Sequence, residues 1–522
     1  MIDFAIYYWD GFLNTTLKME NNIEQFSYLF AIVLIIIYSF SLFFIFLYSL
    51  SQLYLLRNYL NFQKIKKKLN PPKQIPWEQL PEVTIQLPVF NEVYVMEQLL
   101  KNISKLNYPK EKLEIQVLDD SDDESVSLTA ALISKIKEKG INIIHLRRKI
   151  RTGFKASALK EGLKSAKGTF IAIFDADFLP EKDWLLNTTP HFQDEKIGVV
   201  QTRWGHQNRN YSILTSVQAF ALDAHFTLEQ VGRNSQNHFI NFNGTAGIWR
   251  KECIIDSGNW QADTLTEDLD LSYRAQLRGW KFKYLEDIIT PAELPVLISA
   301  ARSQQYRWNK GGAETFQKMI KKVLHSKKTP LKTKLYALMH LLNSTMFLNV
   351  FIVAILSIPM LYIKSKWGDL GLYFNLSSMF VISTLIFFIC YWQIHKRIYS
   401  SGFLSFIKYL QSFVVFFTLA MGFSFHNSIA VIQGHLGKKT PFVRTPKFNE
   451  KSFKETLLKN KYINRKISKN TLVEGLLVIY FLFGMYSAFT VDKEGDFGLF
   501  PFHLMLFCGF GYVSLRSLIE GK

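Results

Sequence analysis

Two aspartates, Asp175 and Asp177, stand one residue apart at the end of an apolar run, in FIAIFDADFLP (170–180). A carboxylate is costly in a protein interior unless a cation or hydrogen-bond donors meet it. Two adjacent carboxylates also raise each other's pKa unless a cation lies between them. The pair has two interpretations, a polar turn at the end of a strand or the ligands of a metal ion. The motif alone does not separate them.

Other acids follow strand-like segments in the same way. Glu92 comes soon after VTIQLPV (83–89), and LEIQVLDD (113–120) ends in Asp119 and Asp120. Ligands of a parallel α/β sheet bind at the carboxyl ends of the strands. Mg²⁺ takes one or two carboxylates together with substrate phosphate oxygens. Acids at several strand ends therefore favour a cation that holds a diphosphate.

Strand-like and helix-like segments alternate between residues 80 and 325, which predicts a parallel sheet covered by helices on both faces. The expected strands are 83–89, 113–120, 141–146 and 170–175, and the expected helices are 91–103, 123–138 and 156–166. The chain contains neither GxGxxG nor GxxxxGK[ST]. The sequence therefore argues against an ordinary dinucleotide fold or P-loop.

A later acidic segment, TLTEDLDLSYRAQLRGW (264–280), opens an expected helix. Thr264 and Glu267 have the spacing of a capping box, and acids are favourable near a helix N-terminus. Taken alone, the segment favours capping over catalysis.

The segment SQQYRWNKGG (303–312) places Gln304, Arg307 and Trp308 shortly before the chain returns to apolar sequence. Trp and Arg are common anchors beside membrane spans. Taken alone, these residues are therefore equally well explained by the membrane interface.

The chain is 48% hydrophobic with a net charge of +19, and its three cysteines lie far apart. The cysteine spacing indicates neither a disulfide framework nor a zinc site. Residues 28–50 carry no charge and are long enough to span a bilayer. KIKKK (64–68) places the C-terminal side of this span in the cytoplasm. Further apolar runs lie near 335–363, 371–394, 404–435, 471–490 and 498–517.

The charges between these runs predict the topology. Residues 436–470 contain eleven Lys or Arg against two Glu, and HKR (395–397) is also basic, so both are expected in the cytoplasm. The run 404–435 lies between them and is too short to cross twice at ~20 residues per span. We expect it to be interfacial or re-entrant, which leaves five spans with the N-terminus outside and the C-terminus inside. The alternative is a sixth span with the basic loop outside.

The order of the motifs resembles a known family. LPVFNE, QVLDDS, GFKASALKEG, FDADF, FNGTAG, TEDLDLSYRAQLRGW and QQYRW occur in this order between residues 80 and 325. The set is similar to the family 2 glycosyltransferases, in particular the processive cellulose-synthase-like branch near the glucomannan synthases. The segment KKTPFVRTPK (438–447) is similar to the gating loop of that branch, with Phe442 and Thr445 at its gating positions. It departs from the family's F-x-V-T form, because Arg444 stands where Val is expected.

The resemblance implies an α/β fold: a nucleotide-sugar-binding (GT-A-like, Rossmann-like) cytoplasmic domain inserted between transmembrane α-helices. On this basis we expect an N-terminal segment with one span (1–70), the cytoplasmic glycosyltransferase domain (71–330) and a C-terminal membrane region (331–522). The gating-like loop would occupy residues 436–470 of the last region.

The resemblance also implies roles for individual residues. Asp175 and Asp177 would bind Mg²⁺ or Mn²⁺ on the nucleotide diphosphate, and Asp268, beside Glu267, would be the general base. The implied donor-binding residues are Phe90, Glu92, Asp119, Asp120, Lys155, Asp175 and Arg307. The implied acceptor-binding residues are Gln304, Trp308, Gly244 and Thr245.

The resemblance implies an inverting glycosyltransferase that moves a hexose from UDP-glucose or GDP-mannose onto a growing β-linked polysaccharide of the glucan or mannan type. We further expect that the protein lies in the inner cell membrane and exports the polysaccharide through its own helices, with accessory export subunits as possible partners. The alternative is a single transfer to a lipid acceptor. The aromatic and basic surface that nucleic-acid binding requires is not evident in the sequence. The sequence does not specify the sugar, the linkage or the chain length.

Overall fold

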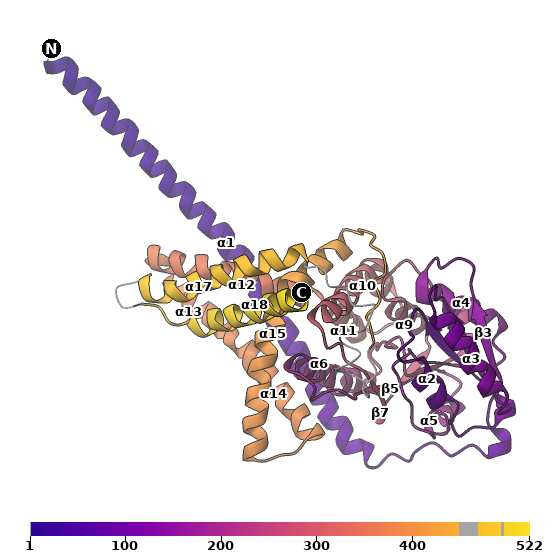
Figure 1. The fold of residues 1–522 in the computed structure, drawn as a ribbon. Helices are drawn as coiled ribbons and strands as arrows, with labels where there is room; N and C mark the ends of the chain where they lie inside the picture. Colours follow the sequence, from indigo (N-terminus) through magenta and orange to yellow (C-terminus); the bar gives the residue numbers. More distant parts are fainter. Residues whose placement is uncertain (1, 448–467, 492–494, 522) are drawn as a thin grey trace.

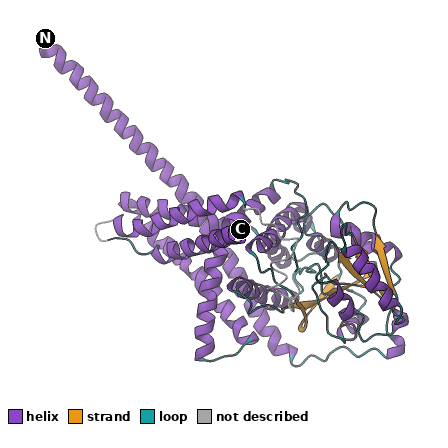
Figure 2. Ribbon diagram, viewed as in Figure 1, coloured by secondary structure: helices purple, strands orange, loops and turns teal. Residues whose placement is uncertain are grey.

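The computed structural model describes residues 2–447, 468–491 and 495–521, with side chains from residue 24 onward. A long N-terminal helix runs past a group of apolar helices, and a domain that contains all the strands lies beside that group (Figure 1). Figure 2 shows that the strands are gathered within this one domain.

The domain has seven strands, which form one sheet with the order β3-β2-β1-β4-β6-β5-β7. The strands are β1 (Val83–Val89), β2 (Leu113–Asp119), β3 (Ile143–Arg147), β4 (Phe170–Ile173), β5 (Ile197–His206), β6 (Gly247–Arg250) and β7 (Lys281–Ala292). Helices of this domain are α2 (Met96–Ile103), α3 (Ser125–Lys137), α4 (Phe154–Ser165), α5 (Trp184–Thr188), α6 (Ile213–Ala224), α7 (Gln230–Asn234), α8 (Lys251–Asp256), α9 (Glu267–Arg278) and α10 (Ile298–His325). A single π-helical turn, η4 (His225–Glu229), joins α6 to α7.

Strands β1 to β4 are parallel, as the alternation of segments predicts, and their register brings the strand ends to one edge. Val89 is opposite Asp119, and Asp119 is opposite Arg147. The first expected helix begins later than residue 91, at Met96, because Asn91 takes a left-handed conformation (φ 55°) that turns the chain after β1.

The sheet is mixed, and this differs from the all-parallel expectation. Strand β6 is antiparallel to both β4 and β5. Its direction follows from the loop before it, because the Ala246 amide bonds to the Ile173 carbonyl (2.9 Å) at the carboxyl end of β4. The chain therefore enters β6 from that edge, and the loop 242–246 lies beside the end of β4.

Apolar side chains cover both faces of the sheet. One buried cluster joins β1 and β2 to α2 and α3, and another joins α4 and β4 to the membrane-side helices. The second cluster contains Leu55, Tyr59 and Cys390, which belong to α1 (Ile2–Lys66) and α14 (Val381–Ile398). The sheet is thus packed directly against helices of the apolar group.

The remaining helices are α11 (Leu331–Leu341), α12 (Thr345–Lys366), α13 (Gly371–Ser377), α15 (Phe403–His435), α17 (Lys469–Thr490) and α18 (Phe500–Glu520). In the described part of the chain, six helices are long and apolar enough to cross a membrane. They are Glu24–Lys66, Thr345–Lys366, Gly368–Ile398, Phe403–His435, Lys469–Thr490 and Phe500–Glu520. The chain therefore has the helices of a multi-pass membrane protein.

Two details differ from the expected apolar runs. The run 335–363 is divided between α11 and α12, which meet at residues 342–344. The run 404–435 forms one continuous helix of 33 residues, α15. By length and composition α15 is one of the six candidate spans, and the five-span topology stays a prediction.

Candidate active site at the carboxyl ends of the strands

Asp175 lies directly beyond β4, and a lysine holds its carboxylate. Lys155 Nζ, from the first turn of α4, lies 2.5 Å from Asp175 Oδ1 and donates to the Gly244 carbonyl (2.9 Å). The Asp175 amide donates to Thr245 Oγ1 (2.9 Å). Asp175, Lys155 and the FNGTAG loop are therefore joined by hydrogen bonds.

Asp177 is buried and incompletely bonded. Its Oδ2 pairs with Lys447 Nζ (2.8 Å) and accepts from the Glu293 amide (3.3 Å). Its Oδ1 is buried without a hydrogen-bond partner among the described residues. A buried carboxylate oxygen without a donor is costly, and a cation would remove that cost.

The residues present fit a divalent cation that is shared with a substrate. Asp175 and Asp177 offer carboxylate oxygens, while no group of three or more His, Cys, Asp or Glu in the described residues could form a metal site by itself. Mg²⁺ usually keeps such an incomplete protein shell and takes phosphate oxygens as well. Glu92 lies near the pair, and burial raises its pKa to about 7 despite Arg444, whose Nη1 lies 3.4 Å away.

Asp119 and Asp120, at the end of β2, are both engaged by partners. Asp119 is buried and accepts from the Ser121 amide (2.9 Å), with His145 Nε2 2.8 Å from its other oxygen. Asp120 accepts from Arg148 Nε (2.9 Å). The two acids lie at the predicted strand end, where Asp119 ties β2 to β3.

Phe90 lies at the end of β1, with the Arg151 guanidinium 3.3 Å above its ring centre. Arg151 belongs, with Arg148, to the basic run HLRRKIRTGFK (145–155), which begins within β3. Sequence reasoning did not select His145, Arg148 or Arg151. The density of positive charge directly after a strand was the signal that could have found them.

Asp268 lies in the first turn of α9, beside the FNGTAG loop. Its Oδ1 accepts from the Leu269 amide (2.8 Å). A Cβ atom at Gly244 would lie 3.0 Å from Asp268 Oδ2, and Gly244 has a φ of +79°, so a glycine is needed for this approach. Burial and the neighbouring Glu267 raise the pKa of Asp268 to about 7.

The capping-box interpretation of Thr264 and Glu267 is wrong. Helix α9 begins at Glu267, its N-cap is Thr266, and no side chain caps it. A capping box needs its acid at the third helical position, whereas Glu267 occupies the first. The acids of this turn are therefore not explained by capping.

Arg307 projects from α10 toward the same acids. Burial lowers its pKa to about 10, an effect opposed by Asp175 and Glu267. Burial likewise raises the pKa of Glu267, an effect opposed by Lys155. Helix α10 reaches this position because Gly311 packs on Thr266, where a Cβ atom would lie 2.5 Å from the threonine methyl group.

Trp308 is the exposed residue of the QQYRW segment. Its side chain is 38% exposed, and its ring centre lies 6.5 Å from that of Trp204. Gln304 is half-buried one turn earlier on the same helix. In contrast, Thr245 is fully buried and its hydroxyl is used by the Asp175 amide. Thr245 thus supports the strand end.

The segment 438–447 lies over the site. Phe442 stacks on Phe154, with the ring centres 5.4 Å apart, and the Arg307 guanidinium lies 4.9 Å from the centre of the Phe442 ring. Arg307 also donates to Thr445 Oγ1 (3.0 Å), and Arg444 donates to the Phe90 carbonyl (2.7 Å). Of the expected loop 436–470, residues 448–467 lie outside the described residues.

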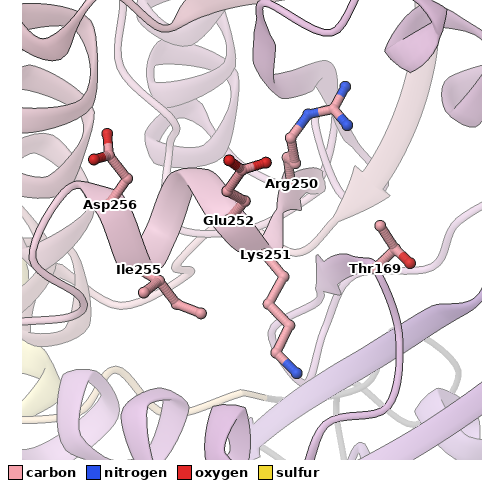
Figure 3. Close-up of a pocket in the computed structure, with 6 residues that line it drawn as sticks. All are labelled: Thr169, Arg250, Lys251, Glu252, Ile255 and Asp256. Atoms are coloured by element: carbon pink, nitrogen blue, oxygen red, sulfur yellow. The ribbon is translucent and has the colours of Figure 1, made fainter.

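A separate surface pocket of about 410 Å³ lies away from these residues (Figure 3). It is lined by Thr169, Arg250, Lys251, Glu252, Ile255 and Asp256. Thr169 immediately precedes β4, whereas Asp175 and Asp177 follow it. The pocket therefore opens at the opposite end of the strand and contains none of the predicted site residues.

The chain is similar to known proteins. A family model described as glycosyltransferase like family 2 matches residues 81–311. The match begins just before β1 and ends within α10, so it includes the strand-end acids, Asp268 and Arg307. The solved mannosyltransferase PcManGT from Pyrobaculum calidifontis, in complex with GDP-Man and Mn2+, aligns with a TM-score of 0.47 at 16% identity, over 76% of this chain and 100% of that chain.

Similar sequences bear related names. Glucomannan 4-beta-mannosyltransferase 1 from Cyamopsis tetragonoloba is 40% identical over 53% of this chain and 52% of its own length. Probable glucomannan 4-beta-mannosyltransferase 11 from Oryza sativa subsp. japonica is 44% identical over 49% and 46%, and glucomannan 4-beta-mannosyltransferase 2 from Arabidopsis thaliana is 41% identical over 52% of each. The alignment spans about half the length of each relative. In its motifs and in these matches, the segment 81–311 is similar to the glycosyltransferase like family 2.

Proposed function

We propose that the protein transfers a hexose from a nucleotide-sugar donor onto a growing β-linked polysaccharide with inversion at the anomeric carbon. One observation carries the proposal. Lys155 joins Asp175 to the Gly244 carbonyl, and Gly244 directly abuts the Asp268 carboxylate. Asp175, which suits a donor diphosphate, is therefore linked through Lys155 to the same loop that Asp268, the acid suited to act as a base, contacts.

The donor end is built for a diphosphate. Asp175 and Asp177 would hold Mg²⁺ or Mn²⁺, which when bound would neutralise the phosphates and favour their departure. Lys155 and Arg307 add positive charge on the protein side, and Arg307 offers the forked donors that fit phosphate oxygens. Phe90, Glu92, Asp119 and Asp120 would form the wall for the nucleotide.

Asp268 would accept the proton of the acceptor hydroxyl while that oxygen attacks the anomeric carbon. A general base works best when its pKa lies near the working pH, and the pKa of Asp268 is raised to about 7. A single displacement of this kind converts an α-linked donor into a β-linked product. It needs no acid to protonate the leaving group, in contrast to glycoside hydrolysis.

The acceptor would lie against Trp308, with Gln304 and Gly244 at its edges. Trp308 offers an exposed aromatic face one residue after Arg307. The names of the relatives favour a mannosyl donor and a 1,4-linkage, so GDP-mannose is our first choice and UDP-glucose the second. Phe442 and Thr445 would close the donor side as gating residues, because both contact Arg307 and Phe442 also stacks on the first residue of α4.

Contacts at both ends of α15 support five membrane crossings with a cytoplasmic domain. Before α15, the Arg209 guanidinium of the domain donates to the Tyr399 hydroxyl (2.7 Å). In its last turns, Gln433 Oε1 lies 2.5 Å from the Tyr306 hydroxyl of α10. A helix whose two ends both contact the same domain fits a position along the membrane surface. Accessory export subunits and the inner cell membrane remain expectations.

Transfer of one sugar to a lipid is the alternative, and the product separates the two. The purified protein is incubated with GDP-mannose or UDP-glucose, and the products are divided into alkali-insoluble glycan and lipid extract. Long glycan that an endo-β-1,4-glycanase digests is the expected result. A glycolipid carrying one sugar would favour the alternative, and no transfer from either donor would contradict the proposed function.

A further inference from the structure

A buried ion pair lies between the apolar helix α1 and the candidate active site. Glu229, the last residue of η4, pairs with Arg233 Nη2 (2.7 Å), and their side chains are 11% and 4% exposed. Burial alone would raise the pKa of Glu229, but Arg233 and His225 hold it well below its usual range. Single π-helical turns inside α-helices are frequent at functional sites. The mechanism proposed above uses none of these residues.

On one side, this carboxylate is bonded to α1. Gln52 Nε2 donates to Glu229 Oε1 (2.9 Å), and the Tyr48 hydroxyl lies 3.3 Å from the same oxygen. Both donors belong to the helix segment that could cross the membrane. Glu229 therefore fixes the domain to a membrane helix at a buried point.

On the other side, the carboxylate sets the state of His225. His225 Nδ1 lies 3.0 Å from Glu229 Oε2, and an ionised carboxylate only accepts, so Nδ1 carries the proton. His225 Nε2 then accepts from Asn243 Nδ2 (3.0 Å). Asn243 Oδ1 accepts from Gln230 Nε2 (2.7 Å), which agrees with this orientation of the amide. The assignment follows from the consistency of the network.

Asn243 immediately precedes Gly244, whose carbonyl holds Lys155 and whose α-carbon abuts Asp268. The bonded path thus runs from α1 through Glu229, His225 and Asn243 to the loop that joins the two ends of the site. A small displacement of Gly244 would change the space beside the Asp268 carboxylate.

We propose that Glu229 and His225 are positioning residues of the sugar-transfer site, which hold the Asn243–Gly244 segment in register against α1. The inference rests on the proposed function for its kinetic consequence, but its structural consequence, a more open loop when the path is cut, does not. Replacing a buried ion pair by apolar groups is often neutral for stability. We therefore expect the Glu229–Arg233 pair to matter for the position of the Asn243–Gly244 segment more than for the stability of the fold.

Glu229→Gln tests the proposal with Glu286→Gln as the matched control. The glutamine keeps the size of the side chain but brings an NH₂ group against the donors Gln52, His225 and Arg233. Glu286 is likewise a buried carboxylate bonded to α1, through Tyr59 (3.2 Å) and Gln63 (2.6 Å). Within the described ranges, the side-chain hydrogen bonds of Glu286 go to α1 and not to residues 241–246. Both changes therefore remove a buried charge beside α1, but only one cuts the path to the loop.

Three measurements are made on both variants in detergent: hydrogen–deuterium exchange of residues 241–246, affinity for UDP and GDP, and kcat of sugar transfer. For Glu229→Gln we expect faster exchange in the loop, nucleotide affinity within about twofold of wild type, and a kcat lower by ~10-fold to 100-fold, as misplaced catalytic groups produce. For Glu286→Gln we expect unchanged exchange in the loop and an unchanged kcat. Equal loop exchange and equal kcat in the two variants would overturn the proposal.

His225→Leu provides a second variant that leaves the Glu229–Arg233 pair and its bond to Gln52 in place. If the hydrogen-bonded path acts through His225, this variant should also show faster exchange in the loop and a lower kcat. It therefore tests the positioning role even if Glu229→Gln does not fold. If His225→Leu leaves both quantities unchanged, the proposal is wrong. A wild-type protein that transfers no sugar would contradict the proposed function, while the exchange measurement would still decide the positioning role.

Discussion

Replacing Asp268 by asparagine separates catalysis from a structural role in the first turn of α9. The amide side chain of the Asp268→Asn variant retains an oxygen that can accept from the Leu269 amide, as Asp268 Oδ1 does at 2.8 Å. An acid that only favours the N-terminus of a helix contributes about 0.3–1 kcal/mol. Loss of a general base lowers the rate by about 10²- to 10⁴-fold. A structural role therefore predicts a small loss of stability, whereas a role as general base predicts a large loss of rate.

The protein's fold and donor site should survive the change. Burial and Glu267 disfavour the ionised form of Asp268, so a neutral side chain removes an unfavourable charge. Asp175 and Asp177 are untouched, and nucleotide affinity should stay within about twofold of wild type because the donor contacts are intact. The measurements are the initial rate of sugar transfer, the affinity for UDP and GDP, and the Tm in detergent.

Asp263→Asn is the control for this experiment. Asp263 precedes α9 and pairs with Lys318 (2.8 Å), and its side chain is 57% exposed. An exposed pair contributes roughly 0–1 kcal/mol to stability, so this variant should keep the wild-type rate. If Asp268→Asn also elongates glycan at near the wild-type rate, Asp268 is not the base.

The pH dependence, the metal and the membrane topology give three further predictions. Because Asp268 must be deprotonated to accept a proton and its pKa is raised to about 7, kcat/KM should be low below pH 7 and rise to a plateau above it; a rate independent of pH between about 5.5 and 8 would contradict this. Excess EDTA should abolish transfer and added Mn²⁺ should restore it, and full activity in EDTA would contradict the metal assignment. Asp177→Asn should weaken metal-dependent nucleotide binding at least ~10-fold, since a divalent cation would lose one of its two carboxylates. A cysteine at Ser400 should resist an impermeant thiol reagent outside sealed cells while one at Gly495 reacts. A Gly495 cysteine that does not react would overturn the five-span topology.

The sequence predicted four of the seven strands of the domain, β1 to β4, and placed acids at the ends of three of them. Strand β1 has the expected bounds. Asp120 and Asp175 lie at the same edge of the sheet because the carboxyl ends of parallel strands meet there. Asp268 was identified only through the resemblance. The spacing of Thr264 and Glu267 favoured helix capping, which depends on the residue where the helix begins. That interpretation failed because helix boundaries are the least certain feature of a sequence prediction.

The contacts between distant segments could not be predicted from local patterns. Lys447 pairs with Asp177 from the far end of the chain, and Arg444 reaches the Phe90 carbonyl. Nothing near Lys447 in the sequence indicates a buried partner, because a basic loop is equally well explained by solvent or lipid headgroups. The antiparallel β6 was missed for the same reason, since its direction depends on where the preceding loop is held.

The anomeric configuration of the product tests the central claim most directly. The purified protein is given an α-linked nucleotide sugar, GDP-mannose or UDP-glucose, and the new glycosidic bond is examined by NMR before any digestion. One displacement assisted by Asp268 predicts a β-linkage in every transferred residue. A product with α-linkages would contradict the single displacement, and with it the roles given to Asp268 and the strand-end acids.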